Sequence, residues 1–241
     1  GSFSSFSPEL LGQPSTEFGD FVFGNVHRES YLDSSTGEPF TRVPQPLLPA
    51  KGETLRLQTP DKQNADLRAR LPVALSDADA DYPALSMANY LLGSGGSSRL
   101  WKRIRETDGL SYSVGSHIAW NNFEPSSSWL ASAIFAPQNR AKVEAALRQE
   151  IERALKDGFN AQELDAGRSG LLNFRRLSRA QDDVLASQLA SNLYLGRDFE
   201  VSAKVDAALA TLTPQQVNAA LRKYLKPEAI DMVFAGDFKQ P

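Results

Sequence analysis

Runs of alternating apolar and polar residues constrain the fold most strongly, because a strand with one buried face repeats every two residues. The clearest run is ADLRARLPVAL, residues 65–75. Its alternate apolar positions are Leu67, Ala69, Leu71 and Val73. ETLRLQTP, which precedes it, repeats the pattern with Leu55 and Leu57. The two runs predict two half-buried strands, with all of these residues on the buried faces.

Three further strands follow from the same pattern. SYSVGSHIAW and SSSWLASAIFA both alternate, and the turn-rich sequence NNFEP separates them. This arrangement is typical of a β-hairpin. AIDMVFAGD, close to the C-terminus, predicts a final strand.

Helical spacing dominates between these runs. Asp81 is expected to cap a helix that has Pro83 in its first turn and ends at Gly93. Later apolar stripes are Val143, Leu147, Ile151 and Leu155; Leu164, Leu171 and Leu172; Leu185, Leu189 and Leu193; and Val217, Leu221 and Leu225. Gly158 is expected to close the first stripe, and capping boxes at Asn160–Glu163 and Thr213–Gln216 to open two others. The order predicts an α+β fold whose mainly antiparallel sheet is covered by helices.

Composition excludes several classes of function. The 26 basic and 29 acidic residues give a net charge of −3, which offers no electrostatic reason to expect nucleic acid as a partner. The absence of cysteine excludes disulfides, thiol catalysis and thiolate metal sites. No apolar run approaches the length of a membrane span. Gly1-Ser2 is typical of expression cloning, which predicts that the chain is cut from a longer protein.

Histidine is too scarce for two common hydrolytic sites. A catalytic zinc usually needs three protein ligands, with two of them on one helix face, and the chain has only His27 and His117. We therefore expect no metal site within this chain. A serine hydrolase also needs a histidine base and an exposed serine between a strand and a helix, whereas GSGGS follows a predicted helix.

The sequence GSGGSS, residues 93–98, permits two interpretations. Gly93, Gly95 and Gly96 lead into a helix at Ser97 and Ser98, and a glycine-rich loop at a helix start can bind an anion. No Gly-Lys-Ser or Gly-Lys-Thr follows, and a helix precedes the loop instead of a strand. The alternative is a sharp turn whose glycines adopt positive φ and whose serines cap the next helix.

Arg105 and Tyr112 form a second candidate site. Arg105 lies in the last turn of the helix predicted after the Gly/Ser turn, and Tyr112 opens the next strand beyond a break at Asp108-Gly109. A guanidinium fork and a phenolic hydroxyl at one edge suit the binding of a peptide carbonyl or a developing oxyanion. Spacing alone equally permits a purely structural pair, with Arg105 at a helix C-terminus and Tyr112 as a core aromatic.

The chain resembles the C-terminal half-domain of the pitrilysin/insulinase family of zinc metallopeptidases, which includes the mitochondrial processing peptidase. The resemblance runs from about Phe40 to VFAGD, and its most specific parts are TPDKQNA, DYPAL with ANYLLG, SSRL, and RE with GLSYSV. It implies that residues 40–241 are an inactive half-domain and that residues 1–39 are a linker or the tail of a preceding domain. The family's zinc motif, His-x-x-Glu-His, is absent from this sequence.

The resemblance also implies a function. In that family two homologous α+β halves enclose a chamber for an unfolded peptide, and the half like this one contributes an Arg and a Tyr at the positions of Arg105 and Tyr112. Zinc would belong to the partner half, upstream on the same polypeptide or on a separate subunit. The turn from Gly93 to Ser98 would lie at the chamber or at the interface between halves. Bacterial members are often exported, which implies a periplasmic or otherwise exported location.

Three functions thus follow from the sequence. The first is the non-catalytic, substrate-binding half of a zinc metalloendopeptidase, inactive alone. The second is a scaffold or interaction subunit that keeps the fold without proteolysis. The third is an anion- or nucleotide-binding module built on the glycine turn.

Overall fold

The computed structural model describes residues 41–238. The strands are β1 (Thr54–Gln58), β2 (Ala65–Val73), β3 (Ser111–Ala119), β4 (Ser127–Phe135) and β5 (Asp231–Gly236). The α-helices are α3 (Tyr82–Asn89), α4 (Arg140–Asp157), α5 (Ala161–Ser178), α6 (Asp182–Tyr194), α7 (Phe199–Thr211) and α8 (Pro214–Tyr224). Two π-helices, η2 (Tyr90–Ser94) and η3 (Trp101–Thr107), follow α3, and η4 (Pro137–Asn139) and η5 (Pro227–Ala229) are short 3-10 helices.

The five strands form one sheet in the order β1-β5-β2-β4-β3. The β2–β4, β2–β5 and β3–β4 pairs are antiparallel, and β1 lies parallel to β5. β3 and β4 form the predicted hairpin. The predicted α+β fold with a mainly antiparallel sheet is therefore confirmed.

The chain divides into two compact units. The sheet and most helices belong to one unit, whereas residues 179–199, which include α6, belong to the other. The predicted linker, residues 1–39, lies outside the described residues. None of the described helices is long and apolar enough to cross a membrane.

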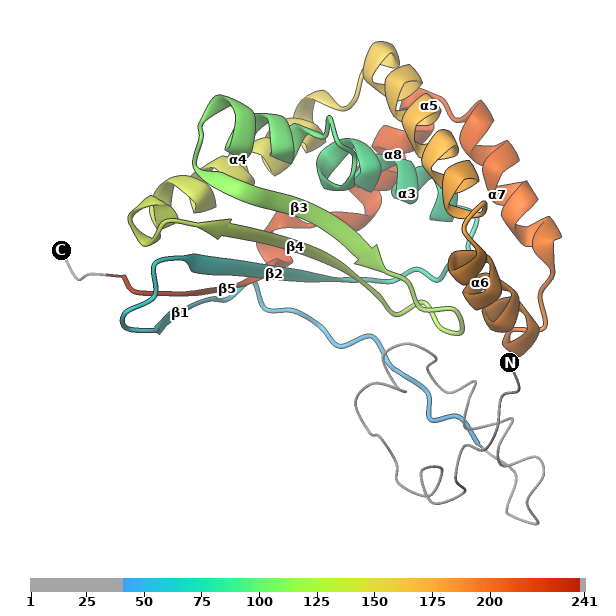
Figure 1. Ribbon diagram of the computed structural model, residues 1–241, viewed down its shortest axis with the longest axis horizontal. Coiled ribbons are helices and arrows are strands. Elements are labelled where there is room, and N and C mark those ends of the chain that lie inside the picture. The colour runs from blue at the N-terminus through green and yellow to red at the C-terminus, as the bar shows by residue number, and fades with distance from the viewer. Residues whose placement is uncertain (1–40, 239–241) are drawn as a thin grey trace, which may run out of the picture. The chain divides into compact units, whose positions relative to one another are not determined.

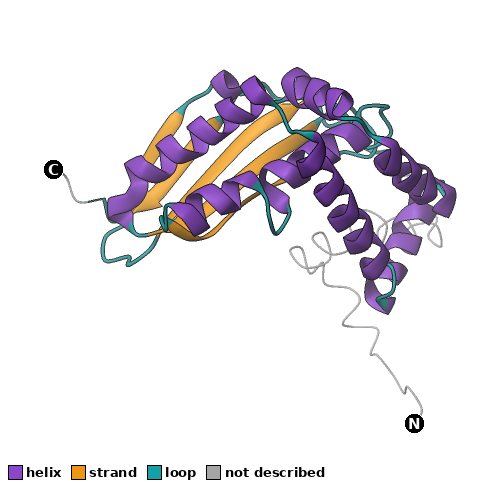
Figure 2. Cartoon of the chain, turned by 90° about the horizontal axis from the view of Figure 1, so that it is seen from above, coloured by secondary structure: helices purple, strands orange, loops and turns teal. Residues whose placement is uncertain are grey.

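Helices of the first unit cover one face of the sheet. Figure 1 shows α3, α4 and α8 on the same side of the strands, and Figure 2, seen from above, shows helices lying over the strands. The strand residues buried beneath these helices include Leu67, Leu71, Trp129, Phe135, Met232 and Phe234. The helices contribute Val143, Leu147, Ile151, Val217 and Leu221 to the same core. The alternation in β2 and the stripes on α4 and α8 thus predicted their buried faces correctly.

The prediction for β1 is wrong in its orientation. Leu55 and Leu57 are 53% and 51% exposed, and they pair with Val233 and Ala235 on the face away from the helices. Thr54 faces the helical layer instead, where Arg148 Nη2 donates a hydrogen bond to Thr54 Oγ1 at 3.2 Å. A one-residue change of register reverses both faces of a strand, and the alternation within one edge strand does not specify which face is buried. The sheet therefore has an open face that carries exposed leucines.

Two of the three predicted caps are confirmed. Asn160 Oδ1 accepts from Glu163 N at 2.9 Å while Glu163 Oε2 accepts from Asn160 N at 3.0 Å. Thr213 and Gln216 form the same reciprocal pair at the start of α8. Gly158, with φ of 73°, ends α4 as predicted.

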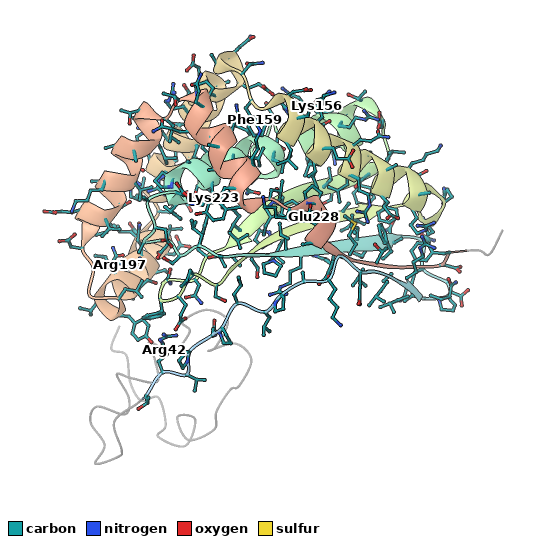
Figure 3. The ribbon with its side chains drawn as sticks, turned by 180° about the vertical axis from the view of Figure 1, so that it is seen from behind. Arg42, Lys156, Phe159, Arg197, Lys223 and Glu228 are labelled. Carbon is teal, nitrogen blue, oxygen red and sulfur yellow. The ribbon has the colours of Figure 1, made fainter. Side chains whose placement is uncertain are left out.

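Asp81 precedes α3 without capping it through its side chain. The carboxylate instead accepts hydrogen bonds from Lys223 Nζ at 2.6 Å and Tyr224 OH at 2.9 Å, both on α8. Lys223 is labelled on that helix in Figure 3. The two hydrogen bonds hold the pKa of Asp81 below its ordinary value, and the bond from Lys223 has the larger effect. They also join α3 to α8.

Candidate substrate-binding site

The Gly/Ser turn, residues 93–98, connects two π-helices. Gly95 N donates to Tyr90 O at 2.8 Å at the end of η2, and Asp108 N donates to Arg103 O at 3.0 Å at the end of η3. Both are i→i+5 bonds, which are rare and occur frequently at functional sites. The wider turns change the direction of side chains on η3 relative to a regular α-helix.

Two glycines, Gly93 and Gly115, are required where the turn and β3 approach each other closely. A Cβ on Gly93 would lie 2.1 Å from Ser116 Oγ and 2.7 Å from Ser116 N, and a Cβ on Gly115 would lie 2.9 Å from Gly93 O. The turn therefore packs backbone against backbone on β3. The prediction that Gly93, Gly95 and Gly96 adopt positive φ is wrong, because the described glycines with positive φ are others: Gly52, Gly109, Gly158 and Gly196.

A buried polar network fixes this contact. Asn89, 7% exposed at the end of α3, accepts at Oδ1 from Ser116 Oγ (2.7 Å) and from Trp129 Nε1 (3.0 Å). Its Nδ2 donates to Ser116 O at 3.3 Å. These three partners come from β3 and β4, and Asn89 Nδ2 also donates to Ser94 Oγ of the turn at 3.4 Å, so the network ties the start of the turn to the sheet. Asn89 was not among the predicted site residues, although an asparagine inside the apolar run SMANYLL is a signal for a buried polar contact.

Arg105 is exposed on η3. Its guanidinium carbon lies 4.5 Å from the ring centroid of Trp101, a cation–π contact, and Trp101 Nε1 donates to Glu106 Oε1 at 3.1 Å. Within residues 41–238 the Arg105 guanidinium makes no hydrogen bond or ion pair. The stacked ring orients the guanidinium and leaves its N–H groups available to a ligand.

Tyr112 is exposed by a β-bulge. The register between β3 and β4 shifts between Ser111 and Ser113, which leaves Tyr112 without a cross-strand partner in β4 and 55% exposed. The Ser111 hydroxyl lies 2.7 Å from Ser113 O and 2.6 Å from Ile134 O, and Ser113 N donates to it at 3.2 Å. Bulges redirect side chains, and this one turns Tyr112 outward with its hydroxyl unpaired among the described groups.

Arg105 and Tyr112 flank one short connection, as the sequence predicted. Gly109, with φ of 60°, turns the chain, and Leu110 N donates to Ile104 O at 2.9 Å before β3 begins at Ser111. The strand starts at the predicted residue. The alternative that Tyr112 is a core aromatic is wrong, because the bulge exposes it.

Four of the five remaining predicted residues line a cavity of about 560 Å³ between the turn, η3 and α5. Gly95, Gly96, Ser97 and Ser98 form its wall on the turn side, and Gly93 is not among the lining residues. Neither serine caps η3, and the Ser98 hydroxyl is buried without a hydrogen-bond partner. The prediction that the serines cap this helix is therefore wrong. The contribution of α5 to this cavity was not predicted from the sequence.

An ion pair forms part of the cavity lining. Arg99 Nε and Nη2 donate to Glu163 Oε1 and Oε2 at 2.8 and 2.9 Å, and Arg99 also stacks on Phe159 at 4.5 Å. Figure 3 shows Phe159 between α4 and α5. Burial raises the pKa of Glu163, but the bonds from Arg99 and Asn160 N and the nearby positive charges outweigh it, so its pKa lies below the ordinary value.

Metal ligands do not gather in this part of the chain. Residues 41–238 contain no group of three or more His, Cys, Asp or Glu side chains that could hold a metal ion. His117 lies on β3, and His27 is outside the described residues. The donors present in this range do not fit a catalytic zinc.

Comparison with known proteins identifies the family. The family model described as peptidase M16 inactive domain matches residues 13–171. This chain belongs to the peptidase M16 inactive-domain family. An uncharacterized zinc protease of Mycobacterium bovis is 30% identical over 143 residues, which are 59% of this chain and 32% of that protein.

Solved structures support the fold. The peptidase M16 inactive domain from Pseudomonas fluorescens matches with a TM-score of 0.72 at 22% identity, over 85% of this chain and 48% of that one. A protease from Helicobacter pylori matches with a TM-score of 0.71 at 17% identity, over 88% of this chain and 51% of that one. The M16 inactive-domain chain thus spans about half of these proteins, and about a third of the mycobacterial one.

Proposed function

We propose that this M16 inactive domain is the substrate-binding half of a zinc metalloendopeptidase that cleaves unfolded peptides. It would close a peptide chamber against a zinc-bearing half, upstream on the same polypeptide or on a separate subunit. Zinc and the water that it activates would come from that half, because the described residues of this chain lack the ligands. The observations that carry the proposal are the outward, unpaired hydroxyl of Tyr112 and the stacked guanidinium of Arg105, which flank the short connection between η3 and β3.

The Tyr112 hydroxyl is the proposed donor to the scissile carbonyl. As that carbonyl oxygen gains negative charge, a hydrogen bond from a phenol strengthens, which lowers the barrier more than it stabilises the bound substrate. The Ser111 bulge contributes by holding the side chain outward before substrate arrives. Such preorganisation avoids a reorganisation cost during the reaction.

Arg105 is proposed to bind a neighbouring carbonyl of the peptide. Its guanidinium presents several donors in a fixed plane, and the contact with Trp101 restricts the orientation of that plane. A backbone carbonyl is common to every substrate residue. Binding through Arg105 therefore suits a peptidase that accepts different unfolded sequences.

The open face of the sheet is the proposed wall for the rest of the peptide. Leu55 and Leu57 expose apolar surface there, and Arg68, paired with Asp66 at 3.2 Å, supplies charge on the neighbouring part of that face. A surface that mixes apolar and charged groups can bind extended peptides of varied sequence. This face is continuous across β1, β5 and β2.

The test is reconstitution with the zinc-bearing half and cleavage of an unfolded peptide. Tyr112→Phe is expected to lower kcat about 100- to 1000-fold, the loss typical of one oxyanion donor. Arg105→Gln is expected to lower kcat/KM, and Lys142→Gln, an exposed change on α4, is the control and should leave activity unchanged. Full activity of Tyr112→Phe would refute the role of the hydroxyl. Tight association of the two halves with no peptide cleavage would favour the scaffold function instead.

A further inference from the structure

The cavity beside the Gly/Ser turn is lined mainly by glycines and cations. Gly95 and Gly96 of the turn line it together with Gly167 and Gly170 of α5, and Tyr90 forms part of the wall. Gly167 and Gly170 let α5 approach η2 closely, since a Cβ on them would lie 2.4 Å from Leu91 Cδ2 and 2.6 Å from Tyr90 OH. These two glycines therefore pack against η2, whereas the backbone at Gly96 is open to a ligand.

The charge of the lining is positive. Four basic residues line the cavity, against the single carboxylate of Glu163: Arg99, Lys102, Arg103 and Arg153. Glu163 is already paired with Arg99. Arg103 and Arg153 pair with Asp108 at 2.6 Å and Glu150 at 2.8 Å, neither of which lines the cavity.

Lys102 is the cation that remains available. Its side chain is exposed and forms no ion pair with a described residue. It lies close enough to Glu163 for its charge to lower the pKa of that carboxyl. An anion in the cavity would therefore find one ammonium group without a carboxylate partner.

Two buried polar groups at the cavity lack partners. The Ser98 hydroxyl has no hydrogen bond although the residue is only 2% exposed, and Arg99 Nη1 is likewise buried and unpaired. Native proteins rarely leave such groups unsatisfied. Their position on the lining of one cavity suggests that their acceptor is a bound group.

Backbone donors of the turn point to the same chemistry. The N–H groups of Gly96 and Ser97 make no hydrogen bond to any described residue. Nothing lies within 4 Å of the position of a Cβ on Gly96, so the backbone there is open. Successive free N–H groups in a turn form a concave surface that binds anions.

We propose that this cavity binds an oxyanion, a carboxylate or phosphate group, through the Ser98 hydroxyl, the Lys102 ammonium and the N–H groups of Gly96 and Ser97. The oxyanion could be a free ion such as inorganic phosphate or the C-terminal carboxylate of a peptide. Both present several oxygens to the same donors. The inference does not depend on the proposed protease role, and the isolated 241-residue chain can be tested.

Isothermal titration calorimetry at low ionic strength tests the proposal with inorganic phosphate, with acetyl-Ala-Ala as its free acid, and with the same peptide amidated. We expect the chain to bind phosphate or the free acid, and not the amide. A response to phosphate alone would identify a free ion as the source, and a stronger response to the free acid would identify a peptide terminus. No heat with either anion at about 10 mM would overturn the proposal, because one charge-assisted site of this kind should saturate there.

Variants locate the site. Ser98→Ala and Lys102→Gln should each weaken binding about tenfold, the effect of one lost hydrogen bond to a charged group. Lys142→Gln removes the same charge from α4, away from the cavity, and should leave affinity unchanged. Because Lys102 is exposed, its substitution tests binding without disturbing the core. Equal affinity of Ser98→Ala, Lys102→Gln and the unchanged chain would place the anion elsewhere and refute the assignment.

Discussion

Gly93→Ala tests whether close packing of the Gly/Ser turn on β3 stabilises the domain. The new Cβ would lie 2.1 Å from Ser116 Oγ, whereas ordinary contact begins at 3.4 Å. Ser116 could rotate its hydroxyl away, but it would lose its 2.7 Å hydrogen bond to Asn89. The backbone nitrogen of Ser116, 2.7 Å from the same position, cannot move without displacing β3.

The expected cost follows from these two contacts. Forced overpacking costs about 1–3 kcal/mol, and the lost hydrogen bond adds about 1 kcal/mol. Gly93→Ala should therefore lower the free energy of unfolding by about 2–4 kcal/mol. For a domain of this size that corresponds to a decrease in Tm of about 4–16 °C.

Gly96→Ala is the matched control, because the same methyl group is added three residues later in the same turn. No atom lies within 4 Å of its Cβ position, and its φ is not in the left-handed region. The substitution should change stability by no more than about 1 kcal/mol, in the stabilising direction, since alanine reduces the entropy of the unfolded chain.

Urea unfolding followed by tryptophan fluorescence compares the two variants. Three tryptophans report on the chain, and Trp129 shares the Asn89 network with Ser116. The double variant Gly93→Ala/Ser116→Ala should recover only part of the loss, because the backbone nitrogen remains in place. If Gly93→Ala and Gly96→Ala unfold at the same urea concentration, the close contact does not determine stability and the reasoning fails.

Three further predictions concern other contacts. Asn89→Ala should lower the free energy of unfolding by about 3 kcal/mol in a denaturation experiment, because the buried Trp129 indole N–H loses its acceptor. A decrease below about 1 kcal/mol would contradict this. Glu163→Gln should cost about 1–2 kcal/mol at pH 7 by breaking the pair with Arg99. The pKa of Glu163 is lowered in the folded state, so its stabilisation is complete above the ordinary value of 4.5 and is lost as the pH falls below it. The difference in Tm between the unchanged chain and Glu163→Gln should thus shrink on acidification, and a constant difference would argue against the ion pair. Thr213→Ala should lower the free energy of unfolding by about 1 kcal/mol, because it removes the cap of α8. Thr211→Ala is the comparison, since Thr211 is an exposed threonine at the end of α7 without a capping role.

Local sequence predicted the caps whose partners are close along the chain. The Asn160–Glu163 and Thr213–Gln216 pairs each lie within four residues, so the local sequence contains both partners. Asp81 has the same residue type as a cap, yet its carboxylate binds Lys223 and Tyr224 of α8. A partner more than 140 residues away competes with the local N–H groups, and local sequence gives no information about it.

The sequence alone also determined where the candidate site residues lie along the chain. The break at Asp108-Gly109 predicted that Arg105 lies in the last turn of a helix and that Tyr112 lies at the start of a strand, as the structure has them. It did not predict the bulge that exposes Tyr112, because a bulge depends on pairing with β4. The role of the two side chains toward a peptide stays a prediction.

The element types, the buried faces of β2, α4 and α8, and membership of the M16 family were determined by the sequence, because periodicity and short motifs are local properties of the chain. Tertiary structure decided the rest. Contacts between distant segments decided which face of β1 is buried and why position 93 requires glycine. They also formed the cavity that Lys102 and residues of α5 line together. Such contacts exist only after the chain has folded, so local patterns in the sequence do not specify them.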